Sequence, residues 1–240
     1  MHLRLAILAS ALTARTVAPF AAAPRRAAAP RLHMAGDGDG DDVVTLGIFG
    51  GGTVGGGIVE ILAKKAASFR QLTGKTIAVK KICVRDASKP RDFAVPEGCS
   101  IVTSYDDILD DEGIDVAVEV MGGTTDAKDV VVGALKKGKA VVTANKALIA
   151  RDLPELESLL ASLDGGAEFR YEAAVCGGIP IIRSMQSDFV GDEVTFLSGI
   201  INGCTNYMLT AMDRDGQSYE EALAQARKII ERRTDCSDRL

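Results

Sequence analysis

The sequence predicts an α/β protein in which a Rossmann domain, a doubly wound parallel sheet, precedes an incomplete α+β domain. Three observations support this. Short apolar runs alternate with amphipathic stretches from Val43 onward, as in βαβ units. A glycine-rich turn separates the first strand-like run from the first helix-like stretch. The alternation changes beyond Gly165, where a second domain is expected to begin.

Composition and charge limit the functions that the chain can have. Hydrophobic residues make up 47% of the 240 positions and charged residues 25%, as in an ordinary globular enzyme. The net charge of -5 argues against nucleic acid as a partner, and no run beyond residue 40 is apolar enough to cross a membrane. Both histidines, His2 and His33, precede the first domain, which excludes histidine-based triads and metal sites from it. The cysteines form no CxxC pair, so neither a zinc site nor a disulfide framework is indicated.

Residues 1–42 have the composition of a targeting leader and linker. An apolar stretch, Leu5–Leu12, precedes a tract rich in Ala, Arg and Pro with no acidic residue before Asp37. This pairing resembles the bipartite leaders of complex plastids and favours a plastid (chloroplast) location. A mitochondrial leader or a disordered arm is the alternative.

Four apolar runs have the length of buried strands: Val43–Phe49, Ile77–Val84, Ile114–Val120 and Ala140–Thr143. Helical spacing of apolar residues predicts a first helix that contains Val54, Ile58, Ile61 and Leu62. A second helix ends at Gly138 and has one apolar face, made of Ala127, Val130, Val131, Ala134 and Leu135. A third is expected to begin near Pro154 and to carry Leu156, Leu159, Leu160 and Leu163.

The second half of the chain has a different pattern. A Gly-rich turn between Tyr171 and Pro180 precedes a strand-like run from Val194 to Ile201. The last expected helix opens at Ser218, where Glu221 completes a capping box. We therefore expect a leader and linker at 1–42, a dinucleotide-binding Rossmann domain at 43–165 and a partial substrate and dimerisation domain at 166–240.

The glycine-rich turn has the pattern G-x-G-x-x-G, formed by Gly50, Gly52 and Gly55. The first glycine permits a tight bend, the second lets a pyrophosphate approach the backbone, and the third lets the helix pack on the strand. The N–H groups that open the helix, at Thr53 and Val54, would face this anion. The flanking strand and helix favour a dinucleotide site over an unliganded turn.

The segment after the second expected strand bears on the choice between NAD and NADP. An acidic residue there binds the ribose hydroxyls of NAD, whereas cations bind the 2′-phosphate of NADP. Arg85 and Lys89 make NADP slightly favoured over NAD. For Asp86 and Arg91 a solvated loop is the better interpretation.

Three further segments carry distinctive patterns: VVTANKA at 141–147, YEAAVCGGIP at 171–180 and GIINGCTNY at 199–207. With the glycine loop and Gly122-Gly123-Thr124, they resemble the homoserine dehydrogenase family in order and spacing, from about Val43 to Ala226. Cys176 and Cys204 stand where the family more often has Gly and Thr.

The resemblance implies a reaction: reversible NAD(P)H-dependent reduction of L-aspartate 4-semialdehyde to L-homoserine, in threonine and methionine biosynthesis. Lys146 matches the active-site lysine, whose ammonium can stabilise the alkoxide that develops as hydride arrives. The resemblance places Lys146 against the cofactor as well, together with Gly123 and Thr124.

The resemblance also implies substrate, cation and subunit contacts. Substrate contacts are implied for Asn202, Gly203 and Thr205. A monovalent cation such as sodium is implied at Glu172 and at the carbonyl oxygens of Val175, Gly177 and Ile179, because oxygen ligands suit hard cations. A homodimer is implied for the full-length protein.

The C-terminal segment departs from the family. The family continues into an acidic stretch with a substrate-binding Glu, one or more Asp and a second lysine, whereas residues 227–240 are basic and polar. The prediction is therefore a C-terminally truncated homoserine dehydrogenase, with an inactive dinucleotide-binding subunit as the alternative. A semialdehyde dehydrogenase ranks third, because Cys176 and Cys204 lack an adjacent His base.

Overall fold

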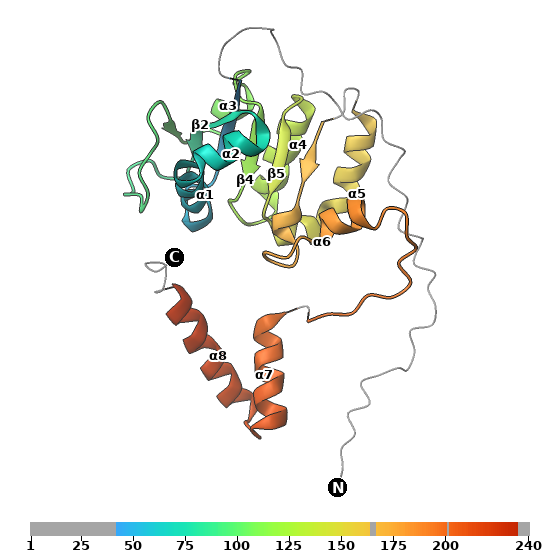
Figure 1. The fold of residues 1–240 in the computed structure, drawn as a ribbon. Helices are drawn as coiled ribbons and strands as arrows, with labels where there is room; N and C mark the ends of the chain where they lie inside the picture. Colours follow the sequence, from blue (N-terminus) through green and yellow to red (C-terminus); the bar gives the residue numbers. More distant parts are fainter. Residues whose placement is uncertain (1–41, 164–166, 201, 235–240) are drawn as a thin grey trace. The chain divides into compact units, whose positions relative to one another are not determined.

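The structure is a computed structural model that describes residues 42–163, 167–200 and 202–234 (Figure 1). The chain divides into a first compact unit that ends at Val175 and a second that begins at Cys176. The predicted leader lies outside the described residues apart from Asp42, and so do residues 235–240. No helix in the described ranges is long and apolar enough to span a membrane.

The first unit is built on a six-stranded sheet with the order β3-β2-β1-β4-β5-β6. Its strands are β1 (Val43–Phe49), β2 (Thr76–Cys83), β3 (Ser100–Val102), β4 (Val116–Glu119), β5 (Ala140–Thr143) and β6 (Phe169–Arg170). Every neighbouring pair is parallel. This is the strand order of a Rossmann domain, so the predicted fold and the four predicted strands are confirmed.

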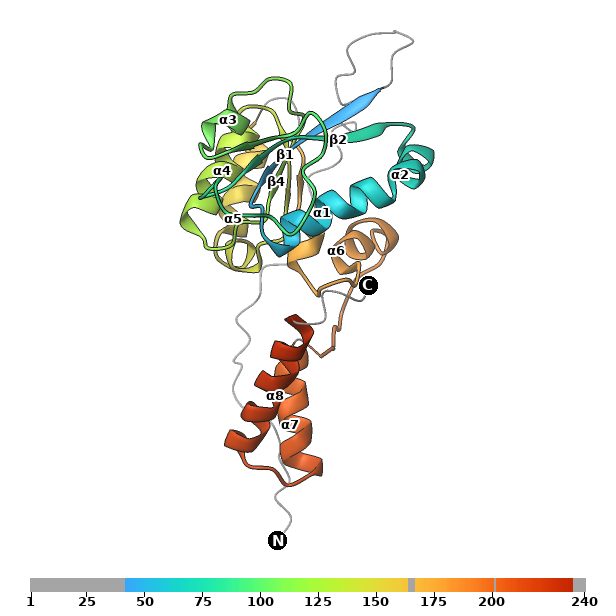
Figure 2. The ribbon, with the colours of Figure 1, turned by 90° about the vertical axis from the view of Figure 1, so that its left-hand side faces the viewer.

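Helices cover both faces of this sheet, as Figure 2 shows. They are α1 (Thr53–Lys64), α2 (Ala66–Thr73), α3 (Asp106–Leu109), α4 (Thr125–Lys136) and α5 (Lys146–Ser162). On one face Val59 of α1 packs on Ile48 and Ile82. On the other face α4 and α5 pack around Phe49, and all five apolar residues predicted for α4 are buried. Gly138 has a φ of 75° and ends α4 as predicted.

The start of α5 differs from the prediction, since the helix begins at Lys146 and contains Pro154 in its interior. Asn145 is the N-cap, and its side-chain oxygen accepts a hydrogen bond from Leu148 N at 3.1 Å. Proline removes one helical hydrogen bond, but Leu148 and Leu156 are fully buried on either side of it. The cap and this burial therefore outweigh the proline as a start signal.

The predicted domain boundary at Gly166 also changes. Gly166 itself lies outside the described residues, but Phe169 and Arg170 of β6 pair with Val141 and Val142 of β5. The sheet therefore extends past the predicted boundary, and the first unit continues to Val175. A two-residue strand is too short to show a period in the sequence.

The second unit contains helices only, among its described residues. They are α6 (Ile181–Arg183), the π-turn η2 (Ser184–Asp188), α7 (Gly203–Arg214) and α8 (Tyr219–Thr234). The capping box is confirmed, because Ser218 N donates to Glu221 Oε2 at 2.8 Å and Glu221 N to Ser218 Oγ at 3.2 Å. The strand prediction at 194–201 is wrong for residues 194–200, while Ile201 lies outside the described residues. No strand is described in this unit that could form backbone hydrogen bonds with residues 194–200.

Candidate functional site

The carboxyl ends of four strands lie in one row at one edge of the sheet. Phe49 is in register with Cys83 on one side and Glu119 on the other, and Glu119 is in register with Thr143. The glycine loop, the segment Gly122–Thr124 and Lys146 each follow one of these strand ends. In doubly wound sheets, ligands bind at this edge where the strand order reverses, which here is between β1 and β4.

Each glycine of the loop has its own physical reason. Gly50 has a φ of 114°, which side chains other than glycine rarely tolerate. A Cβ on Gly55 would lie 2.0 Å from the carbonyl oxygen of Gly50, so this glycine lets α1 pack against the loop. A Cβ on Gly52 would have no protein atom within 4 Å. Packing therefore explains Gly50 and Gly55, while Gly52 faces open space that a ligand can enter.

The start of α1 supplies hydrogen-bond donors to the same space. Gly52 is the N-cap, and no side chain caps the helix. Thr53 and Val54, the first two helical residues, are exposed. Uncapped N–H groups at the positive end of a helix form an anion site, so this segment fits the pyrophosphate of a dinucleotide.

The loop after β2 carries the predicted specificity residues. Arg85 and Lys89 are exposed there. Asp86 forms a local turn, in which its carboxylate accepts from Ser88 Oγ at 2.6 Å and Ser88 N at 2.9 Å, and these hydrogen bonds lower the pKa of Asp86. The solvated-loop interpretation holds for Asp86.

The same interpretation is wrong for Arg91. Its guanidinium donates to Gly51 O at 3.4 Å and to Asp86 O. Its Nε is buried and has no hydrogen-bond partner among the described residues. Arg91 therefore links the loop after β2 to the glycine loop by hydrogen bonds. Arg91 and Gly51 are 40 positions apart, so the sequence does not reveal this contact.

Lys146 is the first residue of α5 and is exposed. A cation at a helix N-terminus faces the positive end of the dipole, at a cost of about 0.3–1 kcal/mol. No acidic residue of the first turn offsets this. Helix stability therefore does not explain a lysine at this position, and its catalytic role stays a prediction.

Thr124 and Gly123 are held in place by groups that the sequence did not identify. The Arg151 guanidinium donates to the backbone oxygen of Thr124 at 3.0 Å and to its hydroxyl. Asn145 Nδ2 donates to Gly123 O at 2.7 Å and contacts the buried carboxylate of Glu119. The available signal for Glu119 was an acid near the end of the apolar run 114–120, which also contains Asp115.

The predicted substrate residues belong to the second unit. Asn202 caps α7, and its side-chain oxygen accepts from Thr205 N at 2.9 Å. Gly203 is the first helical residue, and all three are exposed. Their role toward a substrate stays a prediction.

The predicted cation ligands fall in both units, two in each, and the site stays a prediction. Glu172 opens the 3₁₀ turn η1 (Glu172–Ala174), and Val175 ends the first unit. Gly177 has a φ of 63°, and Ile179 N donates to Cys176 O at 3.3 Å. No group of three or more His, Cys, Asp or Glu side chains in the described ranges could hold a metal.

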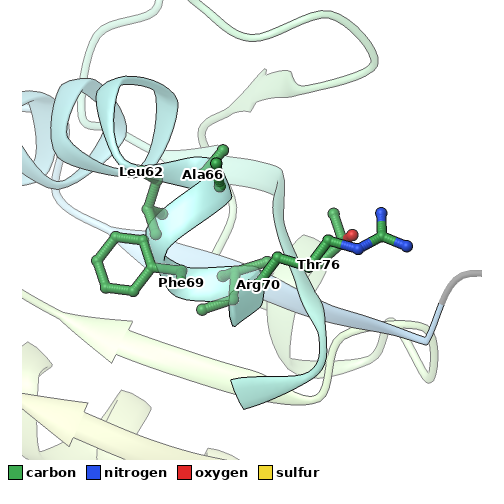
Figure 3. A pocket seen from close by; sticks show the side chains of 7 residues that line it. Leu62, Ala66, Phe69, Arg70 and Thr76 are labelled. Carbon is green, nitrogen blue, oxygen red and sulfur yellow. The ribbon is translucent and has the colours of Figure 1, made fainter. Parts of the chain in front are cut away.

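One hollow of the first unit lies between α1, α2 and the start of β2 (Figure 3). Its lining includes Leu62, Phe69 and Thr76. Thr76 opens β2, so the hollow is at the amino end of that strand, and no predicted site residue lines it.

Comparisons with family models match most of the described chain. Residues 50–172 match the model described as homoserine dehydrogenase, NAD binding domain. Residues 180–234 match the model described as homoserine dehydrogenase, which extends the similarity past Ala226.

Individual relatives agree with these models. The homoserine dehydrogenases of Bacillus subtilis and Synechocystis are 37% and 39% identical to this chain over 78% of its length, and that of Corynebacterium glutamicum is 36% identical over 85%. The alignments cover 42%, 42% and 44% of those relatives. The chain thus spans less than half the length of the curated relatives it matches.

Solved structures show the same likeness. A homoserine dehydrogenase from Thiobacillus denitrificans superposes with a TM-score of 0.72 at 35% identity, over 79% of this chain and 43% of that one. A hyperthermophilic archaeal homoserine dehydrogenase in complex with NADPH superposes with a TM-score of 0.62 at 25% identity, over 78% of this chain and 61% of that one.

Proposed function

Because this chain belongs to the homoserine dehydrogenase family, we propose that it binds NADPH at the carboxyl edge of its sheet and takes part in the interconversion of L-aspartate 4-semialdehyde and L-homoserine. One observation carries this proposal. The strand register brings the open glycine loop after β1 and Lys146 after β5 to one edge, with only β4 between those strands.

The residues of the first unit fit a bound dinucleotide. Gly52 leaves space for the pyrophosphate, and the uncapped N–H groups of Thr53 and Val54 can donate to it. Gly123 and Thr124 follow β4 at the same edge and would contact the cofactor beyond its pyrophosphate. When bound there, the nicotinamide ring would supply the hydride for the reduction.

Lys146 performs the chemistry that the protein itself contributes. Its ammonium donates to the carbonyl oxygen of the semialdehyde and stabilises the negative charge that this oxygen gains. A hydrogen bond that strengthens as charge develops lowers the barrier more than it tightens substrate binding. Lys146 is therefore proposed to act on the rate.

We propose NADPH rather than NADH as the preferred cofactor. Arg85 is exposed where the 2′-phosphate would lie, and none of the described side chains forms an ion pair or hydrogen bond with its guanidinium. Asp86, the acid that could hold the ribose hydroxyls of NADH, is already engaged by Ser88. The NADPH complex of the archaeal relative supports the same choice.

Homoserine-dependent reduction of NADP⁺, followed by absorbance, tests the function. The chain should show slow activity, because residues 227–240 depart from the family's substrate-binding segment, and Lys146→Ala should remove it. Lys64→Ala is the matched control, because Lys64 is an exposed helical lysine whose ion pair with Glu60 lies on the surface. Cofactor binding without turnover by the native chain would contradict the catalytic proposal and favour a dinucleotide-binding subunit.

Two further proposals rest on the sequence and the family. We propose that the full-length protein is a homodimer, which light scattering tests, and that it is imported into a plastid, which a fluorescent fusion of residues 1–42 tests. A monomer in the first experiment, or a mitochondrial signal in the second, would contradict them.

A further inference from the structure

Glu119, the last residue of β4, is a buried acid. It is 1% exposed, and none of the described lysines or arginines forms an ion pair with it. A buried carboxylate is costly unless hydrogen bonds satisfy it. The hydrogen bonds that the carboxylate accepts must therefore offset the free-energy cost of its burial.

The carboxylate gathers donors from both segments of the site. Oε2 accepts from the hydroxyl of Thr143 at 2.6 Å, and Oε1 accepts from Met121 N at 2.9 Å. Asn145 Nδ2 approaches Oε1 at 3.5 Å. Met121 leads into Gly122–Thr124, whereas Thr143 and Asn145 lead into Lys146. One side chain thus connects the segment that follows β4 with the segment that follows β5.

Thr143 and Asn145 extend this hydrogen-bond network to the start of α5. Thr143 Oγ1 accepts from Asn145 N at 3.0 Å, which leaves its own hydrogen for Glu119. Asn145 caps α5 through its oxygen, at 3.1 Å from Leu148 N, and donates through its nitrogen to Gly123 O at 2.7 Å. The amide can serve both partners in one orientation only. The network therefore fixes Gly123 relative to the first turn of α5, where Lys146 lies.

We infer that Glu119 is a positioning residue that holds the cofactor segment Gly122–Thr124 and Lys146 in one fixed arrangement. The inference rests on the proposed function, and it adds a residue that contacts neither substrate nor cofactor. A general contribution to stability does not require the acid to join these two segments, because an apolar side chain could fill the same volume. The network predicts that substitutions within it weaken NADPH binding even in variants that remain folded. A loss of folding stability alone would not do this.

NADPH titration of folded variants of the 240-residue chain, followed by fluorescence, tests the inference. Thr143→Val keeps the side-chain shape but removes the hydroxyl from Glu119 and from Asn145 N. Glu119→Gln keeps the shape but leaves one acceptor oxygen in place of two, so either the Thr143 hydroxyl or Met121 N loses its acceptor. Both should raise the Kd for NADPH about tenfold, the effect of losing one buried hydrogen bond. Thr143→Ser should restore the native Kd, since serine retains the hydroxyl.

Lys139→Met is the matched control for stability. Lys139 is 6% exposed and donates to Asp111 O at 2.6 Å and Ile114 O at 3.0 Å, at the amino edge of the sheet. This variant should lose stability in urea yet bind NADPH like the native chain. Native affinity in Thr143→Val or Glu119→Gln, or equal weakening by Lys139→Met, would overturn the inference alone. Failure of the native chain to bind NADPH would overturn the proposed function and the inference with it.

Discussion

Two glycines of the same loop should respond to the same substitution in opposite ways. Gly52 has an extended conformation, with a φ of -91°, that alanine adopts, and its Cβ would contact nothing within 4 Å. Gly55→Ala would place a methyl group 2.0 Å from Gly50 O. Gly52→Ala should therefore spare the fold and weaken the cofactor, whereas Gly55→Ala should damage the fold itself.

The magnitudes follow from these contacts. Alanine at Gly52 gains about 0.4–1 kcal/mol by restricting the unfolded chain and loses a similar amount as a poorer N-cap, so stability should change by less than about 1 kcal/mol. The methyl group would displace the pyrophosphate from one or two N–H donors, which corresponds to about 10- to 100-fold weaker NADPH binding. At Gly55 the backbone must move, at a cost of about 1–3 kcal/mol or more.

Urea unfolding and NADPH fluorescence titration of both variants separate these effects. Gly52→Ala should unfold at a urea concentration near that of the native chain and bind NADPH weakly. Gly55→Ala should unfold at a clearly lower urea concentration. Native NADPH affinity in Gly52→Ala would refute the assignment of the open space beside Gly52 to the cofactor.

Three other predictions concern the cofactor phosphate, acid stability and a buried thiol. Arg85→Ala should weaken NADPH by about 1.5–3 kcal/mol and NADH much less, because only NADPH brings a phosphate to the guanidinium; equal weakening of both in titrations would contradict this. Hydrogen bonds from Lys80 and Lys81 lower the pKa of Asp111 below its ordinary value, so Asp111 stabilises the fold above about pH 4 and this contribution is lost as the pH falls. Urea midpoints should therefore fall less steeply with acid in Asp111→Asn, and an unchanged slope would argue against it. Burial, together with Asp107, raises the pKa of Cys83 to about 11, so iodoacetamide at about pH 8 should modify Cys83 only after unfolding, as mass spectrometry of the labelled peptides can check; labelling of Cys83 in the folded chain would contradict its burial.

The sequence predicts those parts of the fold that local patterns determine. The strand Val43–Phe49 matches residue for residue, and the buried face of α4 follows from helical spacing alone. Two other elements depended on competing helix-start signals or on pairing with another strand. Asn145 outweighs Pro154 as the start of α5, and the run after Val194 has strand composition but no described strand beside it. Neither outcome can be read from one segment by itself.

The residues of the candidate site also divide into those that local backbone geometry determines and those that depend on distant partners. Gly50, Gly52 and Gly55 were predictable because backbone geometry imposes them locally. Arg91 and Glu119 were missed because their partners are distant in sequence and are brought together only by the register of the sheet. A charged residue that interrupts an apolar strand is the local sign of such a network.

NADPH titration of the 240-residue chain is the decisive measurement, since the glycine loop, Gly122–Thr124 and Lys146 all lie in the first unit. We expect saturable enhancement of NADPH fluorescence that NADP⁺ reverses by competition. We also expect that Gly52→Ala, which should remain folded, binds much more weakly. A folded native chain that shows no binding at about millimolar NADPH, a concentration at which even binding energies near 4 kcal/mol are detected, would contradict the claim.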